Sequence, residues 1–342
     1  MKHLAIGPGA MTYFAFLGAM GALRDCHELD NLEDISGASA GGLLAFFYLV
    51  AEGNIKTILD YSLDIPIKDI MKPNIRQFLK NFGLVSQRKI RNVIIDIIRV
   101  FFSKEDLTFR ELQALRPTMP KVHVSAYCVN LARTEYFSCD STPNMSVVDA
   151  LCMTIAVPFL FASVEYQGRR YIDGGTMEET PGGIFVGKAD VKTMRSMWAK
   201  ESVEYDTRNL KSYITSILNT TMCLRPRYKY PTVDVDMSNF ELFDFGVSTE
   251  TKLKMFSFGY HSTFSQVEKS YTICHPGEEY SPPQELHIDQ SRHMGQCVVE
   301  NSPDHPEQTE QSPQDEMKTV SVSTHSSSST PRTVQKSRDT EL

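Results

Sequence analysis

The stretch LEDISGASAGGLLAFFYLVA, residues 32–51, decides the fold. Its first residues, Leu32 to Ile35, have the apolar character of a short buried strand, and Ala40 to Ala51 predict a strongly apolar helix. Between them lies the Gly-x-Ser-x-Gly motif of residues 37–41, in which the glycines are Gly37 and Gly41. A serine on a strained strand-to-helix turn needs small neighbours, so that the backbone can turn tightly and the hydroxyl can project. The motif therefore predicts Ser39 as a nucleophile, and the alternative is a Gly/Ser packing turn between two close helices.

The residues before this motif add a second tight loop. His3 to Ile6 predicts a strand and Met11 to Cys26 a helix, with Gly7-Pro8-Gly9-Ala10 between them. Strand, glycine-rich turn, helix, strand, sharp turn and helix together predict an α/β fold with its site at the strand carboxyl ends. Such a loop presents backbone N–H groups to a phosphate or an oxyanion. A dinucleotide fingerprint would need glycine at position 12, which is Thr12, so the nucleotide interpretation is weak.

Further along the chain, residues 54–115 are mainly helical in pattern and predict an insert after the serine turn. The remaining expected elements are strands at Lys121–Val129 and Thr134–Phe137, a helix at Val147–Ile155, a hairpin at Ser163–Ile172, and helices near Asn209–Asn219 and Thr251–Tyr260. Within the insert, Ile90 to Phe102 has the apolar spacing of a core helix, with several arginines and lysines nearby. Burial in the core is the favoured interpretation, and contact with a lipid interface is the alternative.

Charge and composition divide the chain at residue 275. Residues 276–342 carry 12 of the 42 acidic and 5 of the 35 basic side chains, so residues 1–275 hold 30 of each. This balance argues against nucleic-acid binding by bulk charge. The last 67 residues are rich in Ser, Pro and Gln and contain Tyr280 as their one aromatic residue, so we expect an acidic, disordered tail. The predicted domain is 1–275, with its motifs in 1–185.

Cysteines and apolar runs bear on the compartment. The 7 cysteines form no Cys-x-x-Cys pair, which argues against a disulfide scaffold or structural zinc site and for a reducing, cytoplasmic location. The uncharged run Leu4 to Leu23 follows Lys2 as in a signal peptide, yet Gly7-Pro8-Gly9 interrupts it and no small-x-small cleavage pattern follows. We therefore expect a folded segment here, and no membrane span elsewhere.

A serine nucleophile needs a base to accept its proton. The histidines of the predicted domain, at positions 3, 27, 123 and 261, lie in no recognisable motif, so we expect structural roles for them. The acidic candidate is Asp173, which is followed by Gly174 and Gly175 and would expose its carboxylate in a turn. From these residues alone, an ordinary Asp-Gly turn is the better interpretation.

The order of glycine-rich loop, Gly-x-Ser-x-Gly and Asp-Gly-Gly resembles the patatin-like phospholipases. The similarity extends to residues 121–137, to the small-residue-Pro turn at Pro158, to the stretch from Tyr166 to Pro181, and to Phe243–Phe245 with the helix after it. It covers about residues 1–265. The resemblance implies a three-layer α/β hydrolase fold with a mainly parallel central sheet and a helical insert after the nucleophile turn.

By this resemblance, Ser39 is the nucleophile, Asp173 accepts its proton without a histidine, and Gly7, Gly9 and Ala10 form the oxyanion hole. The chain departs from the common Gly-Gly-Gly-x-Arg-Gly loop at Pro8, Met11 and Thr12, and Glu179 stands where the family often has Asn. Because proline has no N–H, one oxyanion donor is missing, and losing such a donor costs roughly 2.7–4 kcal/mol of barrier.

These features predict a cytoplasmic hydrolase of acyl-lipid esters that works through an acyl-enzyme. The resemblance implies a phospholipid or other acyl-lipid substrate and contact with a membrane or lipid-droplet surface. It implies no metal and no organic cofactor, because a Ser–Asp dyad and backbone donors suffice for acyl transfer. Two alternatives stay open: an acyltransferase on the same dyad, or a catalytically weak lipid-binding or regulatory protein.

Overall fold

The structure is a computed structural model that describes residues 1–76, 78, 82–197 and 228–274. The first half of the chain forms β1 (His3–Ile6), η1 (Ala10–Thr12), α1 (Tyr13–Asp25), β2 (Asp34–Ala38), α2 (Ala40–Val50), α3 (Ile55–Asp64), α4 (Ile67–Ile70), β3 (Gly83–Val85), α6 (Arg88–Phe102) and α7 (Phe109–Leu115). The rest of the described chain forms β4 (Lys121–Cys128), β5 (Arg133–Phe137), α8 (Val147–Thr154), β6 (Phe159–Phe161), β7 (Val164–Tyr166), β8 (Arg169–Asp173), η2 (Gly174–Thr176), η3 (Gly183–Phe185), β9 (Val191–Met197), β10 (Thr232–Asp236) and α10 (Thr249–Cys274).

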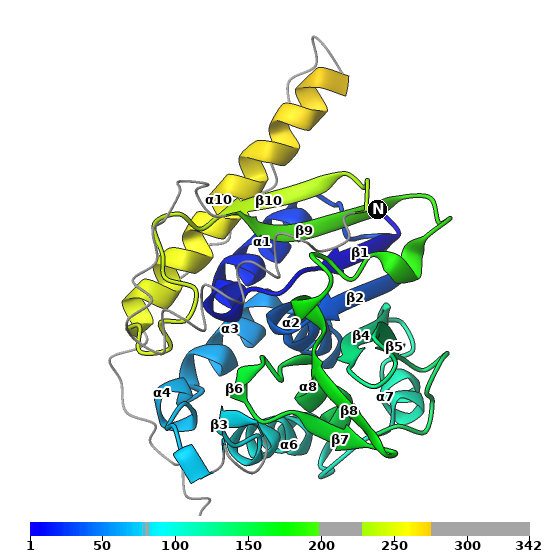
Figure 1. Ribbon diagram of the computed structural model, residues 1–342. Helices are drawn as coiled ribbons and strands as arrows, with labels where there is room; N and C mark the ends of the chain where they lie inside the picture. The colour runs from blue at the N-terminus through cyan, green and yellow to red at the C-terminus, as the bar shows by residue number, and fades with distance from the viewer. Residues whose placement is uncertain (77, 79–81, 198–227, 275–342) are drawn as a thin grey trace, which may run out of the picture. The chain divides into compact units, whose positions relative to one another are not determined.

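The central sheet runs in the order β10-β9-β1-β2-β4-β8-β7, with β5 paired to β4 (Figure 1). The strands from β10 to β4 are parallel, whereas β5, β7 and β8 pair in antiparallel fashion. The expected α/β fold with a mainly parallel central sheet is confirmed. A small second sheet pairs β3 with β6.

Alternate residues of β1 show how the sheet is covered. Leu4 and Ile6 belong to the main core with α1 and α2, while Ala5 packs with Phe185 and Val191 in a separate small cluster. Successive side chains of a strand point to opposite faces. Helices therefore cover one face of β1, and η3 covers the other.

Helices α1 and α10 pack through two glycines. A Cβ atom on Gly18 would lie 2.0 Å from the Phe256 carbonyl oxygen, and one on Gly259 would lie 2.0 Å from the Ala15 carbonyl oxygen. Any side chain at either position would push the helices apart. This contact fixes α10 against the amino-terminal half of the domain.

The expected elements are largely present, but β3 lies in the segment that was expected to be helical and β6 was not expected. The helix expected at Thr251–Tyr260 extends over Thr249–Cys274, and strands β9 and β10 were not expected from the sequence. The helix expected at Asn209–Asn219 and the acidic tail lie outside the described residues, so both stay predictions. No helix in the described part of the chain is both long and apolar enough to cross a bilayer.

Candidate active site

Ser39 lies on a strained turn between β2 and α2. Its backbone has φ +55° and ψ −122°, a conformation that favours glycine, and its side chain is 6% exposed. A Cβ atom on Gly37 would lie 2.3 Å from the Gly41 carbonyl oxygen, and one on Gly41 would lie 2.3 Å from that of Ile6. The two motif glycines thus allow the strand to turn directly into a helix that packs on β1. The Ser39 N–H donates to Thr154 Oγ1 at 2.8 Å and fixes the turn.

Asp173 ends β8 and is 3% exposed. Its Oδ1 accepts a hydrogen bond of 2.7 Å from the Gly175 N–H, which orients the carboxylate within the turn. A Cβ atom on Gly174 would lie 2.4 Å from the Ser125 carbonyl oxygen, so the turn packs closely on β4. The two glycines after Asp173 are therefore required by close approach of the backbone.

Strand register brings Ser39 and Asp173 together. Ala38 pairs with Ser125, and Asp173 pairs with Ala126, the next residue of β4. Strand β5 occupies the other edge of β4 at both positions, so β2 and β8 lie along the same edge. Because β2 runs parallel and β8 antiparallel to β4, their carboxyl ends meet, about 3.3 Å apart along β4. The hydroxyl and carboxylate predicted from separate motifs thus come from abutting strand ends.

The loop after β1 offers fewer amide donors than expected. The Gly7 N–H donates to the Met194 carbonyl at 2.8 Å and so continues the pairing of β1 with β9. The sequence led us to expect Gly7 in the oxyanion hole. An amide that is hydrogen-bonded within the sheet does not point at a substrate, so the structure differs from this expectation. Within the described residues, the N–H groups of Gly9 and Ala10 donate no hydrogen bond. Ala40 begins α2, where the first amides lack intrahelical partners.

Pro8 packs on the Asp-Gly-Gly turn. A Cβ atom on Gly175 would lie 2.3 Å from Pro8 Cβ and 3.0 Å from Asp173 Oδ1. The departure from the family loop at Pro8 is therefore part of a contact between the loop and the turn that carries the carboxylate. Glu179, the other residue that departs from the family pattern, also has a partner: its carboxylate accepts a hydrogen bond of 3.1 Å from the Arg195 guanidinium.

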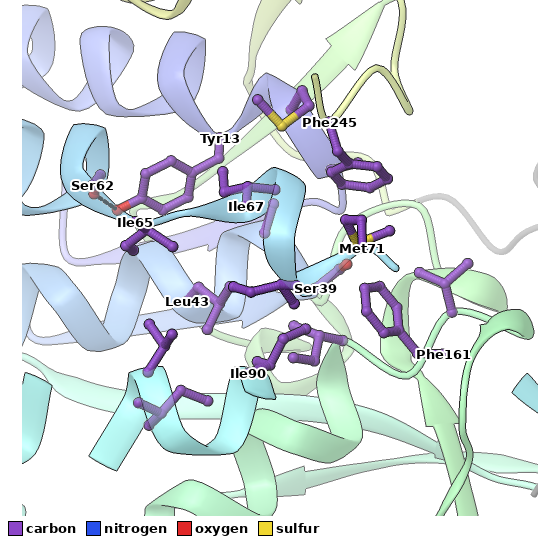
Figure 2. Close-up of a pocket in the computed structure, with 18 of the residues that line it drawn as sticks. Tyr13, Ser39, Leu43, Ser62, Ile65, Ile67, Met71, Ile90, Phe161 and Phe245 are labelled. Atoms are coloured by element: carbon purple, nitrogen blue, oxygen red, sulfur yellow. Dashed lines mark hydrogen bonds between the residues drawn. The ribbon is translucent and has the colours of Figure 1, made fainter. Parts of the chain in front are cut away.

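A cavity of about 160 Å³ opens beside Ser39 (Figure 2). Ala10 and Ala40 also line it, so the two loops that carry the amides face the same space as the serine. The other walls are almost entirely apolar and come from α1, α2, α4 and α6 and from Ile155, Val157, Phe161, Phe243 and Phe245. Tyr13 and Ser62, whose hydroxyls are 2.8 Å apart, lie away from Ser39 in this view.

Helix α6 uses its apolar stripe to build this cavity. Ile90, Val93, Ile94 and Ile97 line it, and Ile94, Ile97 and Ile98 are buried. The core interpretation of this helix is therefore correct for its apolar stripe.

Glu178 is a buried residue that sequence reasoning missed. It accepts hydrogen bonds from the Tyr136 hydroxyl at 2.7 Å and from the Gly183 N–H at 3.1 Å. Burial raises the pKa of its carboxyl, and the hydrogen bonds from Tyr136 and Gly183 offset only part of this effect. No sequence motif marks it, because its partner Tyr136 lies 42 positions away in the chain. It supports the segment that follows Asp173.

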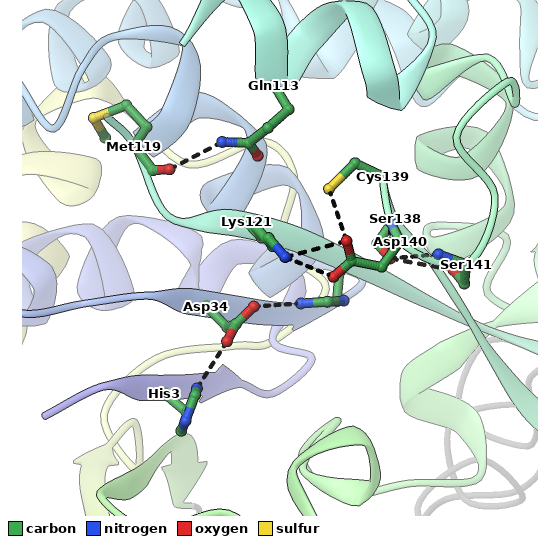
Figure 3. Close-up of polar contacts among 10 residues, drawn as sticks. His3, Asp34, Gln113, Met119, Lys121, Ser138, Cys139, Asp140 and Ser141 are labelled. Carbon is green, nitrogen blue, oxygen red and sulfur yellow. Dashed lines mark hydrogen bonds and ion pairs between the residues drawn. The ribbon is translucent and has the colours of Figure 1, made fainter. Parts of the chain in front are cut away.

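A separate polar cluster lies at the amino ends of β1 and β2 (Figure 3). Asp34 lies 2.9 Å from His3 Nδ1 through one carboxylate oxygen and 2.9 Å from His123 Nε2 through the other. His3, Glu33 and Asp34 lie close enough for metal binding. Glu33 pairs with Lys2 at 2.7 Å, however, so each of these carboxylates already has a basic partner. The cluster is explained by these pairs.

A strained serine on a strand-to-helix turn beside an apolar cavity is the geometry of a nucleophile elbow. Residues 4–186 match the patatin-like phospholipase family, and the chain belongs to this family. The predicted family resemblance is confirmed.

Two relatives are viral proteins. The chain is 27% identical over 216 residues to the uncharacterized protein R571 of Acanthamoeba polyphaga mimivirus, a match that covers 62% of this chain and 70% of the relative. It is 23% identical over 185 residues to the probable lipid hydrolase 463L of Invertebrate iridescent virus 6, covering 53% of this chain and 61% of that protein. The chain thus spans less than two thirds of the second relative.

Two solved structures are similar at low sequence identity. VipD from Legionella pneumophila superposes with a TM-score of 0.48 at 16% identity, covering 78% of this chain and 67% of VipD. A chain of the heterodimeric ExoU–SpcU complex from the type III secretion system of Pseudomonas aeruginosa gives a TM-score of 0.41 at 17% identity, covering 79% of this chain and 51% of that chain.

Proposed function

We propose that this protein hydrolyses carboxylic esters of phospholipids or other acyl lipids through a Ser39 acyl-enzyme, with Asp173 as proton acceptor. The observation that carries the proposal is the meeting of β2 and β8 along one edge of β4, which places the strained serine and the buried carboxylate at abutting strand ends. A nucleophile and its base must lie within reach of one another. The viral relative described as a probable lipid hydrolase supports the same activity.

In the proposed mechanism, the Ser39 hydroxyl gives its proton to the Asp173 carboxylate while Oγ attacks the ester carbonyl carbon. The tetrahedral intermediate collapses, the C–O bond to the alcohol breaks, and Asp173 returns the proton to the leaving oxygen. Water then attacks the acyl-enzyme in the same way and releases the fatty acid. This series of reaction steps requires no metal or organic cofactor.

The developing oxyanion needs preorganised N–H donors. We assign Ala10 and Ala40 to this role, with Gly9 beside them, because Ala10 and Ala40 line the cavity together with Ser39. The positive end of α2 also points to this place, since the helix begins directly after the serine. The Gly7 N–H donates to the Met194 carbonyl and holds the loop to β9, so it is not assigned to the oxyanion.

The apolar cavity supports an acyl-chain substrate. An acyl chain presents only CH₂ and CH₃ groups, and its burial is favourable by ≈0.8 kcal/mol for each CH₂. The wall formed by α6 and α2 offers such a surface along almost its full extent. We propose that the acyl chain binds here and that the alcohol part of the ester lies outside.

The test is hydrolysis of a soluble chromogenic acyl ester and of phosphatidylcholine by the full chain, Ser39→Ala and Asp173→Asn. We expect turnover of both substrates by the full chain alone, and labelling of Ser39 by a fluorophosphonate. Acyl transfer to an added alcohol at the expense of free fatty acid would identify an acyltransferase. Turnover that survives Ser39→Ala would disprove the proposed nucleophile.

We also propose that residues 1–275 form the catalytic domain and that the acidic segment 276–342 has no part in catalysis. The composition of that segment supports the proposal, because it offers little apolar surface for a core. Equal soluble-ester turnover by the full chain and by residues 1–275 would support this division.

A further inference from the structure

One segment of the domain is strongly basic although the domain as a whole is balanced. Residues 65–91 contain 7 basic side chains and 1 acidic side chain, whereas residues 1–275 hold 30 of each. The basic residues are Lys68, Lys72, Arg76, Lys80, Arg88, Lys89 and Arg91. This segment includes α4 and β3 and the first turn of α6. Its charge is therefore a local property that the total charge conceals.

Three of these basic residues have polar partners within the domain, and three others form no ion pair with any described residue. Lys72 pairs with Asp69 at 2.8 Å, the Lys89 ammonium donates to the Asp69 carbonyl at 2.6 Å, and Arg91 pairs with Asp149. By contrast, Lys68, Arg76 and Arg88 are exposed and form no ion pair with any residue that the structure describes. These three remain available to an external anion.

Exposed apolar side chains accompany them. Ile75 is 63% exposed, Phe82 59% and Phe159 38%. Phe82 has φ +62° and Phe159 has φ +67°, a backbone conformation that is an outlier for a bulky residue. Strain of this kind persists where the surrounding structure imposes it, and such positions cluster at functional sites. The fold thus holds two phenylalanines toward solvent in an unfavourable conformation.

The apolar and basic residues lie on neighbouring elements. Gly83 of β3, next to Phe82, pairs with Phe159 of β6. The Asn74 N–H donates to the Leu84 carbonyl at 2.7 Å, which brings Ile75 to the same small sheet. The Lys89 bond to Asp69 ties α4 to α6. Figure 1 shows α4, β3 and β6 close together on the side of the domain below α2 and α3.

This group of elements also borders the cavity beside Ser39. Met71, which follows α4, and Phe161 of β6 both line that cavity. In Figure 2 their side chains lie on the same side of the cavity as Ser39. A surface that binds lipid here would place acyl esters next to the serine.

We propose that Lys68, Ile75, Arg76, Phe82, Arg88 and Phe159, together called the cap surface, dock the protein on an anionic lipid bilayer. The charge selects the partner, because three unpaired cations within a segment of net charge +6 complement anionic head groups. The exposed aromatic and aliphatic side chains enter the boundary between head groups and acyl chains. The proposal specifies where the proposed lipid hydrolase meets its substrate, and it rests on that function for the role of the cavity.

The experiment measures binding of the full chain to phosphatidylcholine vesicles with and without phosphatidylglycerol. We expect much tighter binding when phosphatidylglycerol is present, and loss of this gain at high salt. Lys68→Glu/Arg76→Glu/Arg88→Glu should weaken it by roughly 100-fold or more, since each basic residue near an anionic surface contributes about a fivefold factor. The control Lys104→Glu/Lys188→Glu/Lys254→Glu makes the same charge change at exposed positions elsewhere. It should bind the anionic vesicles at least ten times more tightly than the variant with the three substitutions in the cap surface.

A second variant tests the apolar part. Phe82→Asn/Phe159→Asn removes both rings, and asparagine tolerates a positive φ, so the fold should be retained. We expect at least a tenfold loss of vesicle binding with unchanged turnover of a soluble ester. Equal binding to neutral vesicles, or binding that both variants retain, would overturn the proposal.

The soluble ester separates this proposal from the proposed function. A full chain that binds anionic vesicles through the cap surface but hydrolyses no ester would leave the docking surface standing and remove the hydrolase. Ester hydrolysis without vesicle binding would do the reverse.

Discussion

Buried polar groups differ between the two ends of the parallel strands in the central sheet. We call the side where the strands begin the amino edge and the side where they end the carboxyl edge. At the amino edge, both oxygens of Asp34 face a histidine at 2.9 Å, and the backbone follows regular strands. At the carboxyl edge, the same strands end in a serine with φ +55° and in amides that donate no hydrogen bond within the described residues. A carboxylate that is paired through both of its oxygens stabilises a fold, whereas a strained serine and amides without partners are kept where a substrate completes them. The comparison predicts that mutations at one edge change stability and those at the other change activity.

The largest effect should come from the carboxyl edge. Ser39→Ala and Asp173→Asn should each lower kcat for a soluble ester by roughly 10³-fold or more, because removing one member of a catalytic unit disables the whole. The double variant should be no worse than the poorer single variant. Steady-state kinetics and thermal melts on the same preparations provide the check. A kcat within tenfold of wild type for Asp173→Asn would contradict its role as base.

The amino edge should respond in stability. Asp34→Ala leaves His3 and His123 buried without their shared acceptor, and we expect a loss of about 3 kcal/mol in the free energy of unfolding. The kcat of the folded fraction should stay within twofold of wild type. Asp30→Ala is a matched control, since it breaks an exposed His–Asp pair of 3.1 Å with His27. Urea unfolding should show a loss below 1 kcal/mol there. A similar loss in both variants would end the contrast.

The same pair predicts how stability varies with pH. Burial acts to raise the pKa of Asp34, but the hydrogen bond and charge of His123, with those of His3, outweigh it, so the pKa is lowered. A lowered pKa means that this stabilisation is complete above the unfolded value of about 3.9 and is lost as pH falls through the folded value. The unfolding free energies of wild type and Asp34→Ala should therefore differ at pH 6 and converge as the pH falls through the lowered pKa of Asp34. Parallel curves would contradict this.

Pro8→Gly should have a moderate effect on rate. The substitution restores an N–H and removes the ring that packs on Gly175, so it adds a donor and loosens the loop. Because a donor can contribute more than the roughly 0.4–1 kcal/mol of backbone entropy, we expect a severalfold higher kcat and a slightly lower Tm. An unchanged or lower kcat would mean that Ala10, Ala40 and Gly9 already complete the hole.

The smallest effect concerns strain. Ser39→Gly should abolish turnover but raise the free energy of unfolding by about 1 kcal/mol, because glycine adopts φ +55° without the penalty. Ser39→Ala keeps the strained conformation and should show no such gain. Urea unfolding of the three proteins measures the difference. Equal stability of the glycine and alanine variants would mean that the turn is not strained.

The sequence predicted local features well. Gly37 and Gly41 indicated a turn that only small residues allow, and the backbone of Ser39 agrees. The histidines were expected to be structural, and His3 and His123 do pair with Asp34. Sequence patterns predict a residue's role well when the contacts that require that residue lie within a few positions of it.

Long-range pairing was beyond reach. Strand β9, VKTMRSM, alternates charged, polar and apolar residues and has no strong strand pattern, so its place beside β1 could not be foreseen. That pairing is what engages the Gly7 amide and removes it from the expected oxyanion hole. In the same way, no local pattern shows that β2 and β8 share an edge of β4. The sequence indicated which residues matter, and the sheet determined which of them meet.

The meeting of β2 and β8 has a consequence for the protein during its synthesis. Ser39 and Asp173 are 134 positions apart in the chain. At 5–20 residues per second, Ser39 is made roughly 7–27 s before its proposed base. Throughout that interval the nascent chain contains Ser39 but not the Asp173 carboxylate. On the proposed dyad, the unfinished chain is therefore inert toward the membranes around the ribosome, and activity begins only when β8 docks on β4.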